Sequence, residues 1–281
     1  MVGDARRPGR AAAGLTAGLR AGYDAAAGRW AEGPGQMYAS LATALVAAAP
    51  PPAGCLVLDL GAGDGAAGRA ALAAGAGRVV AADLSVDMLR RGRQVRPAGG
   101  PAPAATVCPV AADAVALPFR DHSFDLVVAA FCLNHLSSLA AGLGEARRVG
   151  AAIAASMFAP GWTHPAKDAV DGVLRSSGYR PPAWHEALSP GSRASDPAEL
   201  ASHAAAAGFR RVQVRVTDVR TAVATPAALV SWRLGMAHAA PFLSSLDAPG
   251  RAAIRTAAMR AVAQTASAGP LIVSMVVLTA C

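Results

Sequence analysis

The chain has 281 residues, 53% of them apolar, which is enough for one large α/β domain or two small ones. Its formal net charge of +8 would suit a nucleic-acid-binding protein. However, the arginines are dispersed, and the dense run at 90–96 has no interleaved aromatic residues, so we interpret it as a solvated helix end and expect no nucleic acid as partner.

The first predicted elements are helical. Residues 1–14 show no clear pattern, and we expect them to be frayed or disordered. Helices are predicted over 15–33 and 37–49, and the three prolines at 50–52 end the second of them.

Strands and helices then alternate along the chain. Strands are predicted over 55–61, 78–85, 105–113, 124–133 and 151–160. Helices are predicted over 66–76, 87–93 and 139–150. Because the strands are almost continuously apolar, this alternation predicts a parallel sheet that is covered by helices on both faces.

The last part of the chain predicts a different edge for this sheet. A helix at 199–209 precedes a strand at 210–219, and a final strand covers 271–280. Two helical segments, 226–240 and 248–268, lie between those strands. We therefore expect a hairpin-like edge with a helical cap inserted between its two strands.

The stretch VLDLGAGDG, residues 57–65, ends a strand in three alternating glycines. Glycines let a ligand lie against the backbone, and the amides at the following helix start favour an anionic group. Residue 66 is alanine, so this is not G-x-G-x-x-G, and no G-K-[ST] makes it a P-loop. The next two strands end in Asp83 and Asp113, where carboxylates suit ribose hydroxyls and an adenine amino group. This series predicts an adenosine site without a pyrophosphate.

Together with AADLSVDML, AADAVALPFRDHSFDLVVAAF and NHL, these motifs resemble the class I S-adenosylmethionine-dependent methyltransferases. The resemblance is to the small-molecule branch, which includes ubiquinone and menaquinone methyltransferases and many enzymes of bacterial natural-product pathways. It covers residues 56–158 with specific motifs and the rest of the chain more loosely. The family's R-P-G-G turn before the fifth strand is absent, which shortens that loop.

The resemblance implies an α/β, Rossmann-like, doubly wound and mostly parallel seven-stranded sheet. Residues 1–52 would form a disordered start and an N-terminal helical lid, and residues 53–159 the cofactor-binding core. Residues 160–281 would supply the acceptor-side loop and helices, the last two strands and the cap. The implied cofactor is S-adenosyl-L-methionine.

The resemblance also implies cofactor contacts at the matched positions. Asp59 and the glycine loop would hold the methionine part, Asp83 the ribose hydroxyls, and Asp113 the adenine edge. Leu84 and Met88 would flank the adenine, and Phe131 would lie beside the sulfonium. The full set of candidates includes one lid residue: Tyr23, Asp59, Gly61, Ala62, Gly63, Gly65, Asp83, Leu84, Met88, Asp113, Ala114 and Phe131.

A sulfonium is an activated leaving group, so the protein has to align a nucleophile with the methyl group and exclude water. We expect no metal. His135 is the candidate general base, because NHL follows the fourth strand; the alternative is that it packs against the cofactor or orients a loop. His164 and His238 are weaker candidates, for a pocket wall or a structural hydrogen bond.

The acceptor is expected between the segment after the fifth strand and the helical insert. The candidate substrate-binding residues are mostly aromatic: Tyr38, Trp162, His164, Trp232 and Met236. A plain core role for Trp232, Met236 and Phe242 stays open, and Tyr23, Trp30 and Tyr38 would form a second lid. Such a pocket suits an apolar or aromatic acceptor rather than a polyanion. We expect methylation of such a metabolite in a bacterial specialised pathway, by in-line displacement.

Two other functions stay open. The basic charge would allow an RNA methyltransferase, although the chain has no N-P-P-[YF] motif, catalytic cysteine motif or added RNA-binding domain. A methyltransferase-like fold would also allow a cyclisation or isomerisation, or binding alone, because a fold does not fix a function. As a partner we expect only a small-molecule acceptor, with the protein a monomer or homodimer.

The four cysteines have no C-x-x-C spacing, so we expect buried free thiols. The N-terminus has no apolar h-region, and the segment at 271–280 has about half of the roughly 20 residues that a membrane helix needs. We therefore expect a cytoplasmic protein that does not associate with a membrane.

Overall fold

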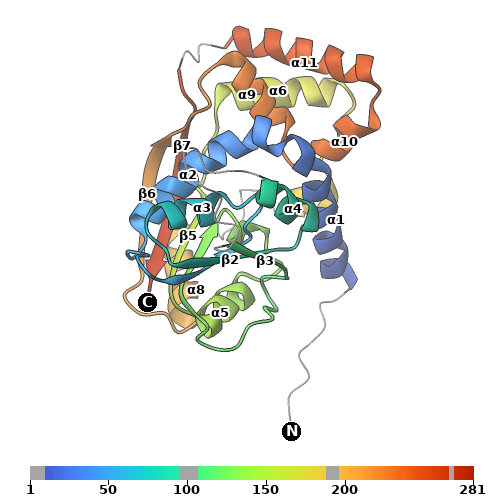
Figure 1. Ribbon diagram of the computed structural model, residues 1–281. Helices are drawn as coiled ribbons and strands as arrows, with labels where there is room; N and C mark the ends of the chain where they lie inside the picture. The colour runs from blue at the N-terminus through green and yellow to red at the C-terminus, as the bar shows by residue number, and fades with distance from the viewer. Residues whose placement is uncertain (1–9, 95–106, 188–195, 266–268) are drawn as a thin grey trace.

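The computed structural model describes residues 10–94, 107–187, 196–265 and 269–281 (Figure 1). Its centre is a seven-stranded sheet in the order β3-β2-β1-β4-β5-β7-β6. The strands are β1 (Leu56–Leu60), β2 (Arg78–Asp83), β3 (Val107–Ala111), β4 (Phe124–Ala130), β5 (Gly150–Phe158), β6 (Gln213–Arg220) and β7 (Ile272–Ala280). The first five are parallel, and β7 runs antiparallel to both β5 and β6. The predicted parallel sheet and its hairpin-like edge are confirmed.

Alternation along the strands decides which face of the sheet each side chain covers. Val57 and Val128 pack in one core cluster with helices α2 (Pro34–Ala48) and α3 (Ala66–Ala73). Leu58 and Val127 pack in another cluster with α5 (Leu139–Val149) and α8 (Pro197–Ala206). Successive strand residues point to opposite faces, so a continuous apolar run buries both faces.

The order of the strands reverses between β1 and β4. From β1 the chain moves outward through β2 and β3, and it returns on the other side of β1 as β4 and β5. The connections therefore diverge at the carboxyl ends of β1 and β4, which leaves a crevice for a ligand at that edge of the sheet.

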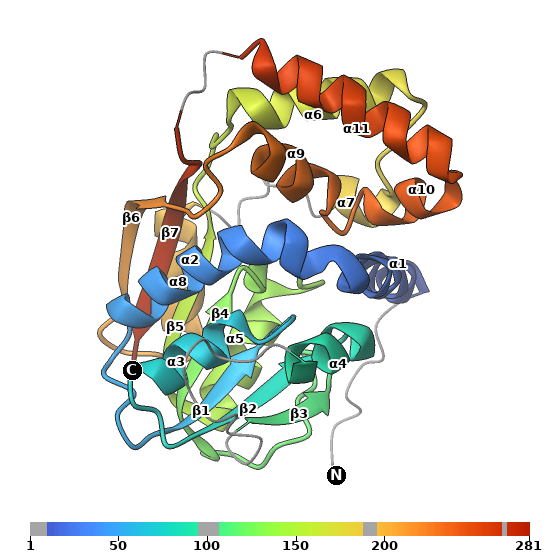
Figure 2. The ribbon, with the colours of Figure 1, turned by 45° about the horizontal axis from the view of Figure 1, so that its top comes forward.

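A second layer of helices lies above this edge (Figure 2). We call it the cap layer. It consists of α6 (Pro165–Ser176), α7 (Ala183–Ala187), α9 (Pro226–Leu234), α10 (Ala240–Ser245) and α11 (Ala248–Ala263). The N-terminal helices α1 (Arg10–Ala26), η1 (Ala27–Glu32) and α2 lie between the cap layer and the sheet (Figure 2). The predicted lid and the helical insert between β6 and β7 are both present.

Several boundaries differ from the predicted ones. Helix α1 begins at Arg10, inside the segment expected to be frayed, whereas residues 1–9 lie outside the described residues. The helix predicted over 226–240 ends at Leu234, where the Gly235 amide donates to the carbonyl of Ser231 at 3.0 Å, and α10 begins only at Ala240. The helix predicted over 248–268 ends at Ala263.

Two helices of the cap layer were not predicted. Helix α6 is preceded by His164, whose side chain accepts a hydrogen bond from the Ala166 amide, and it begins with Pro165. This cap and the first-turn proline are a local start signal that the sequence did contain. Helix α7 has only five residues, too short for a periodic pattern.

The missing R-P-G-G turn has the expected effect. Helix α5 ends at Val149 and β5 begins at Gly150, with no loop between them. A Cβ at Gly150 would lie 2.5 Å from Cγ2 of Val127, so only glycine fits this direct passage.

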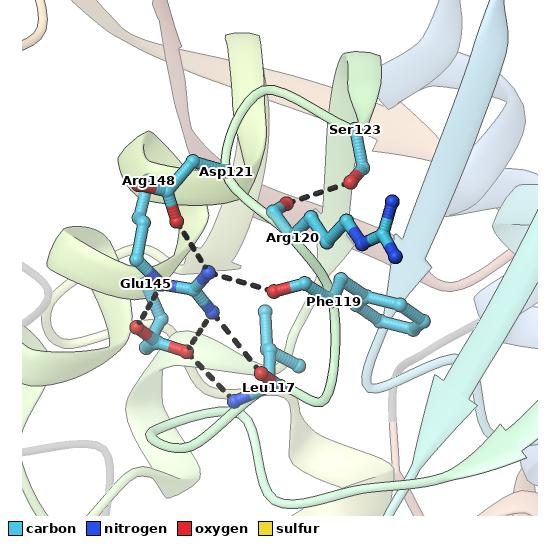
Figure 3. Close-up of polar contacts among 7 residues, drawn as sticks. All are labelled: Leu117, Phe119, Arg120, Asp121, Ser123, Glu145 and Arg148. Atoms are coloured by element: carbon cyan, nitrogen blue, oxygen red, sulfur yellow. Dashed lines mark hydrogen bonds and ion pairs between the residues drawn. The ribbon is translucent and has the colours of Figure 1, made fainter.

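Arg148, at the end of α5, holds the connection between β3 and β4 (Figure 3). Its guanidinium donates to Glu145 and Asp121 at 2.7 and 2.8 Å, and to the carbonyls of Phe119 and Leu117 at 2.7 and 3.0 Å. Glu145 in turn accepts from the Leu117 amide at 2.7 Å. The connection that follows Asp113 is therefore fixed against α5.

The expectation of buried thiols holds only for Cys132. Cys108 is exposed because it lies on β3, an edge strand of the sheet, and Cys281 is exposed at the chain end. Cys55 is half-buried, and all four are free thiols. Of the helices in the described ranges, none combines the length and the apolar character that crossing a bilayer requires.

Candidate active site

A cleft opens at the carboxyl ends of β1, β2 and β4, and we call it the glycine-loop cleft. Gly61 and Gly63 line it, and both have left-handed backbones, with φ of 67° and 54°. A Cβ at Gly61 would lie 2.5 Å from Sγ of Cys132, so both the conformation and the space require glycine. Gly65 has φ of 83° at the start of α3 and does not line the cleft. Ala62 does line it.

Asp59 is an almost fully buried carboxylate on the wall of this cleft, with 1% of its surface exposed. Its Oδ2 accepts a hydrogen bond of 2.6 Å from the Gly68 amide in α3, whereas its Oδ1 is buried without a partner. Burial raises the pKa of Asp59 to about 7. A cationic group in the cleft would satisfy the free oxygen, which is how the ammonium of a methionine tail would fit.

Asp83, at the end of β2, joins the glycine loop to the sheet. Its Oδ2 accepts from the Gly63 amide and its Oδ1 from the Ser85 amide, both at 2.7 Å. Burial raises the pKa of Asp83, and these two amides oppose the shift. Each carboxylate oxygen has a second lone pair, so the fixed carboxylate retains two acceptor positions that suit the hydroxyls of a ribose.

The other predicted cofactor residues divide into two groups. Leu84, Asp113 and Ala114 line the cleft, as expected for the adenine end. Met88 does not line it: this side chain is fully buried, and its methyl group would lie 3.3 Å from a Cβ built on Gly63. Met88 thus supports the loop from behind, because α4 (Val86–Gln94) turns that side chain toward the lid cluster of Tyr23 and Trp30.

Phe131 lines the cleft at the end of β4 in a strained conformation. Its φ is 55°, which a bulky residue rarely adopts, and its amide donates to the Ser156 carbonyl at 2.9 Å. The chain then passes into the short helix η2 (Leu133–His135). Phe131 thus turns the chain so that His135 borders the same cleft.

His135 is half-buried, and its Nε2 lies 3.1 Å from Oη of Tyr23 and 3.4 Å from Nδ2 of Asn134. In the tautomer protonated on Nδ1, Nε2 would accept from these groups; Nδ1 is buried without a partner in the described structure. Burial lowers the pKa of His135 to about 4, and His185 lowers it further. The imidazole is therefore neutral near pH 7, as a proton acceptor has to be.

One face of α1 lies along the cleft, which the sequence reasoning did not foresee beyond Tyr23. The lining residues of α1 are Thr16, Leu19, Arg20 and Tyr23. Their spacing of three and four residues is that of one helix face, a signal that the sequence did contain. With α1 across it, the cleft has a volume of about 130 Å³. Ligand pockets usually measure about 300–1,000 Å³, so a nucleoside requires the lid to move.

A larger cavity, the cap cavity, lies between the lid helices and the cap layer, with a volume of about 490 Å³. Four of the five predicted substrate residues line it: Tyr38, Trp162, Trp232 and Met236. Phe158 stacks on Trp162 with ring centroids 5.1 Å apart. The cap cavity meets the glycine-loop cleft at three shared residues, Tyr23, Tyr38 and His135.

The fifth candidate, His164, is not part of this wall. Its Nδ1 accepts from the Ala166 amide at 3.2 Å, so its role is to cap α6. His238 does line the cavity, and Oη of Tyr179 lies 2.8 Å from its Nδ1. Phe242 packs against the ring of Tyr179 rather than in the wall.

The expectation of an almost wholly apolar pocket is incomplete, because one end of the cap cavity is charged. Lys167, Asp171 and Arg175 of α6 line it together with Arg233 of α9. Arg233 forms a two-pronged ion pair with Asp171 at 2.5 and 2.9 Å, and Lys167 Nζ lies 3.3 Å from the same carboxylate. Within the described ranges, no three histidine, cysteine, aspartate or glutamate side chains gather as metal ligands would.

Comparison with known proteins agrees with this geometry. The methyltransferase-domain family matches residues 57–151. A demethylmenaquinone methyltransferase of Thermobifida fusca is 42% identical over 106 residues, which are 38% of this chain and 43% of that protein. The chain thus matches less than half the length of this curated relative.

Solved structures share the fold at lower identity. A chain in the complex of the Haloferax volcanii Trm112 methyltransferase activator with a putative methyltransferase has a TM-score of 0.56 and 18% identity, over 93% of this chain and 96% of that chain. The [4+2]-cyclase SpnF has a TM-score of 0.51 and 20% identity, over 86% and 80%. Residues 57–151 therefore match a methyltransferase-domain family, and this part of the chain is similar in sequence to a demethylmenaquinone methyltransferase.

Proposed function

We propose that this protein transfers the methyl group of S-adenosylmethionine to a small aromatic metabolite in the cap cavity. The observation that carries the proposal is the junction of the two cavities at Tyr23, Tyr38 and His135. The cofactor supplies an electrophilic methyl group on a sulfonium. A nucleophilic atom of the acceptor would bond to that carbon while the carbon–sulfur bond breaks, and the electron pair of that bond would stay on sulfur, with S-adenosylhomocysteine as the leaving group.

We propose that the chain holds the cofactor through fixed acceptors. The free Oδ1 of Asp59 would bind the ammonium group, and Asp83 the ribose hydroxyls. Asp113 and Ala114 would meet the adenine, and Phe131 would pack beside the sulfonium. Gly65 and Met88 would shape the loop without touching the cofactor.

The role proposed for His135 is to receive the proton that the acceptor loses. Its Nε2 lies 3.1 Å from the Tyr23 hydroxyl; in the tautomer in which Nε2 accepts, Tyr23 would take a proton from the acceptor while passing its own to His135. Burial raises the pKa of Tyr23, which keeps the hydroxyl protonated and able to relay. Trp30 stacks on Tyr38 at 5.4 Å, and we propose that this lid would cover the junction once the cofactor is bound.

The proposed acceptor is a quinone-like small molecule of a bacterial specialised pathway, methylated by in-line displacement. The aromatic wall supports this, since Phe158, Trp162 and Trp232 form a chain of ring contacts at 5.1 and 6.3 Å. The name of the Thermobifida fusca relative also points to a quinone. We propose no nucleic-acid substrate, because the acceptor would lie beneath the cap layer rather than on an open basic surface.

The first test is calorimetry with S-adenosylhomocysteine. Asp83→Ala removes the carboxylate and should weaken binding by about 1–3 kcal/mol, the scale for hydrogen bonds to a charged acceptor. Asp87→Ala is the control, because Asp87 only pairs with Arg90 on the exposed face of α4. Equal affinities in the two variants would remove Asp83 from the cofactor site.

The second test supplies methyl-labelled S-adenosylmethionine with a panel of hydroquinones and naphthols, and separately with total RNA. Label in an aromatic product supports the proposal. Label in RNA alone would identify a nucleic-acid methyltransferase. Binding of the cofactor without transfer to any acceptor, combined with conversion of an acceptor to an isomer, would identify a cyclase or isomerase.

A further inference from the structure

Two of the three cationic residues of the cap cavity, Lys167 and Arg175, come from one face of α6. Lys167, Asp171 and Arg175 are spaced by four residues on α6, so they follow one another along the same face. Arg233 reaches the middle of this row from α9 and pairs with Asp171. The row therefore presents three cations and one carboxylate to the cavity.

The single carboxylate is already engaged by a buried partner. Arg233 and Asp171 have side-chain exposures of 9% and 14%, and their two hydrogen bonds form one closed pair. Lys167 shares Asp171 at 3.3 Å and Asp168 at 3.5 Å, while its own side chain is 27% exposed. Arg175 lies at the exposed rim. Positive charge is thus in excess at this end.

The histidines of the cavity do not add to that charge. Burial lowers the pKa of His185 to about 4, with a further contribution from Arg233, and it lowers the pKa of His238 well below its usual value. Both rings are neutral near pH 7 and stack at 4.3 Å. They extend the aromatic wall toward the cationic end.

Four buried polar atoms of residues in the wall have no hydrogen-bond partner in the described structure: Asn134 Oδ1, His135 Nδ1, Trp232 Nε1 and His238 Nε2. An unpaired buried polar group is costly. Nε1 of Trp232 only donates, so it suits an oxygen of a bound molecule, and Nε2 of His238 donates or accepts according to its tautomer, so it suits a hydroxyl. The cavity is therefore suited to a flat ring system that also carries polar oxygens.

We propose that the acceptor is an aromatic carboxylate whose ring lies against Trp162 and Trp232 and whose carboxylate binds Lys167 and Arg175. This assignment rests on the proposed methyl transfer and narrows its substrate class. A monoanion matches the site, because Asp171 and Asp168 offset two of the three cations, and a mostly aromatic wall disfavours a more highly charged group. Lys167 and Arg175 act as specificity residues, and the reacting atom lies at the far end, beside Tyr23 and His135.

The test uses two probes that differ only in the carboxylate, 1-hydroxy-2-naphthoate and 1-naphthol. Calorimetry measures both dissociation constants, with and without saturating S-adenosylhomocysteine. The wild type should bind the naphthoate more tightly by at least about tenfold, the low end for a hydrogen bond to a charged group. The preference should shrink as salt rises, because part of this site is solvent-exposed.

Lys167→Gln and Arg175→Gln should each reduce the naphthoate preference severalfold and leave naphthol binding unchanged. Arg180→Gln is the matched control, an exposed arginine beyond α6 that does not line the cavity. Arg175 has no ion pair in the described structure, so its variant separates loss of the anion contact from any disturbance of Asp171. Thermal melting of each variant verifies the fold.

Equal affinity of the wild type for the two probes, or a preference that survives both variants, would overturn the assignment. Failure of both probes to bind would overturn it as well. These outcomes are distinct from failure of the proposed function. If the protein binds no S-adenosylhomocysteine but still prefers the naphthoate, the anion site stands and the proposed methyl transfer is wrong.

Discussion

Replacing Asp59 by asparagine tests whether the free carboxylate oxygen is a site for a cation. The amide has the same shape and its oxygen still accepts from the Gly68 amide, but it never ionises. In the wild type the folded pKa is raised to about 7, whereas an unfolded aspartate titrates near pH 4. Asp59 is 1% exposed, so solvent screening is small.

The sign follows from proton binding. Between about pH 4 and pH 7 the folded protein holds a proton on Asp59 that the unfolded chain has lost, so rising pH lowers the free energy of unfolding. The full loss is about 4 kcal/mol, reached above pH 7, because each unit of pKa difference corresponds to about 1.4 kcal/mol. Roughly 2 kcal/mol of it falls between pH 5 and pH 7.

The assay is urea unfolding of the wild type and of Asp59→Asn at several pH values from 5 to 8. Other groups titrate equally in both proteins, so the difference between them isolates Asp59. Across this range, we expect the free energy of unfolding of the variant to rise by roughly 2 kcal/mol relative to that of the wild type. Parallel pH profiles would refute the reasoning, since they would mean that Asp59 is not held protonated by burial.

The same carboxylate should respond to the cofactor. An ammonium group at Oδ1 favours the ionised form, so binding of S-adenosylhomocysteine near pH 6 should release a proton from Asp59. Calorimetry in buffers of different ionisation enthalpy measures that release. Asp59→Asn should bind S-adenosylhomocysteine more weakly, and its binding enthalpy should lose the part of the buffer dependence that comes from Asp59. A buffer dependence equal to that of the wild type would contradict the ammonium contact.

Two further predictions concern His135 and Gly61. His135→Ala should lower turnover by about 10²–10⁴-fold and leave S-adenosylhomocysteine binding nearly intact. The wild-type rate should rise with pH through about pH 4 and stay level from pH 6 to 8. Near-normal turnover in the variant would show that alignment alone drives transfer. In urea unfolding, Gly61→Ala should lower the free energy of unfolding by about 1–3 kcal/mol more than Gly54→Ala. Both glycines have similar left-handed φ, but only Gly61 faces Cys132. Equal losses of stability would exclude overpacking as the cause.

The sequence by itself determined where the strands lie and where the glycine loop follows the first of them. Apolar runs predicted the strands β1 to β5 and β7 to within a few residues, because a strand buried on both faces needs apolar side chains at almost every position. Alternation of apolar and polar residues predicted the edge strand β6. The glycine spacing predicted a backbone that a ligand can approach closely, and the structure shows left-handed conformations at Gly61 and Gly63, which most other residues disfavour. Asp83 and Asp113 could be assigned to the cofactor site because the ends of their strands had been predicted.

Side-chain direction was less predictable. Met88 lies on a correctly predicted helix, yet it faces the lid cluster rather than the cleft. His164 was expected in the acceptor wall, but it caps α6, a helix that had not been recognised. In both cases the residue's neighbourhood depends on how a helix is rotated against its partners, and that rotation is set by burial against distant segments.

Only the tertiary structure decided how the two cavities meet. Tyr23 and His135 are 112 residues apart and Lys167 and Arg233 lie on separate helices, yet each pair faces a common space. A local pattern records which face of an element is apolar, but not which other element covers it. The lid, the cap layer and the strand ends find one another by mutual burial, and that long-range packing created the charged end of the cavity.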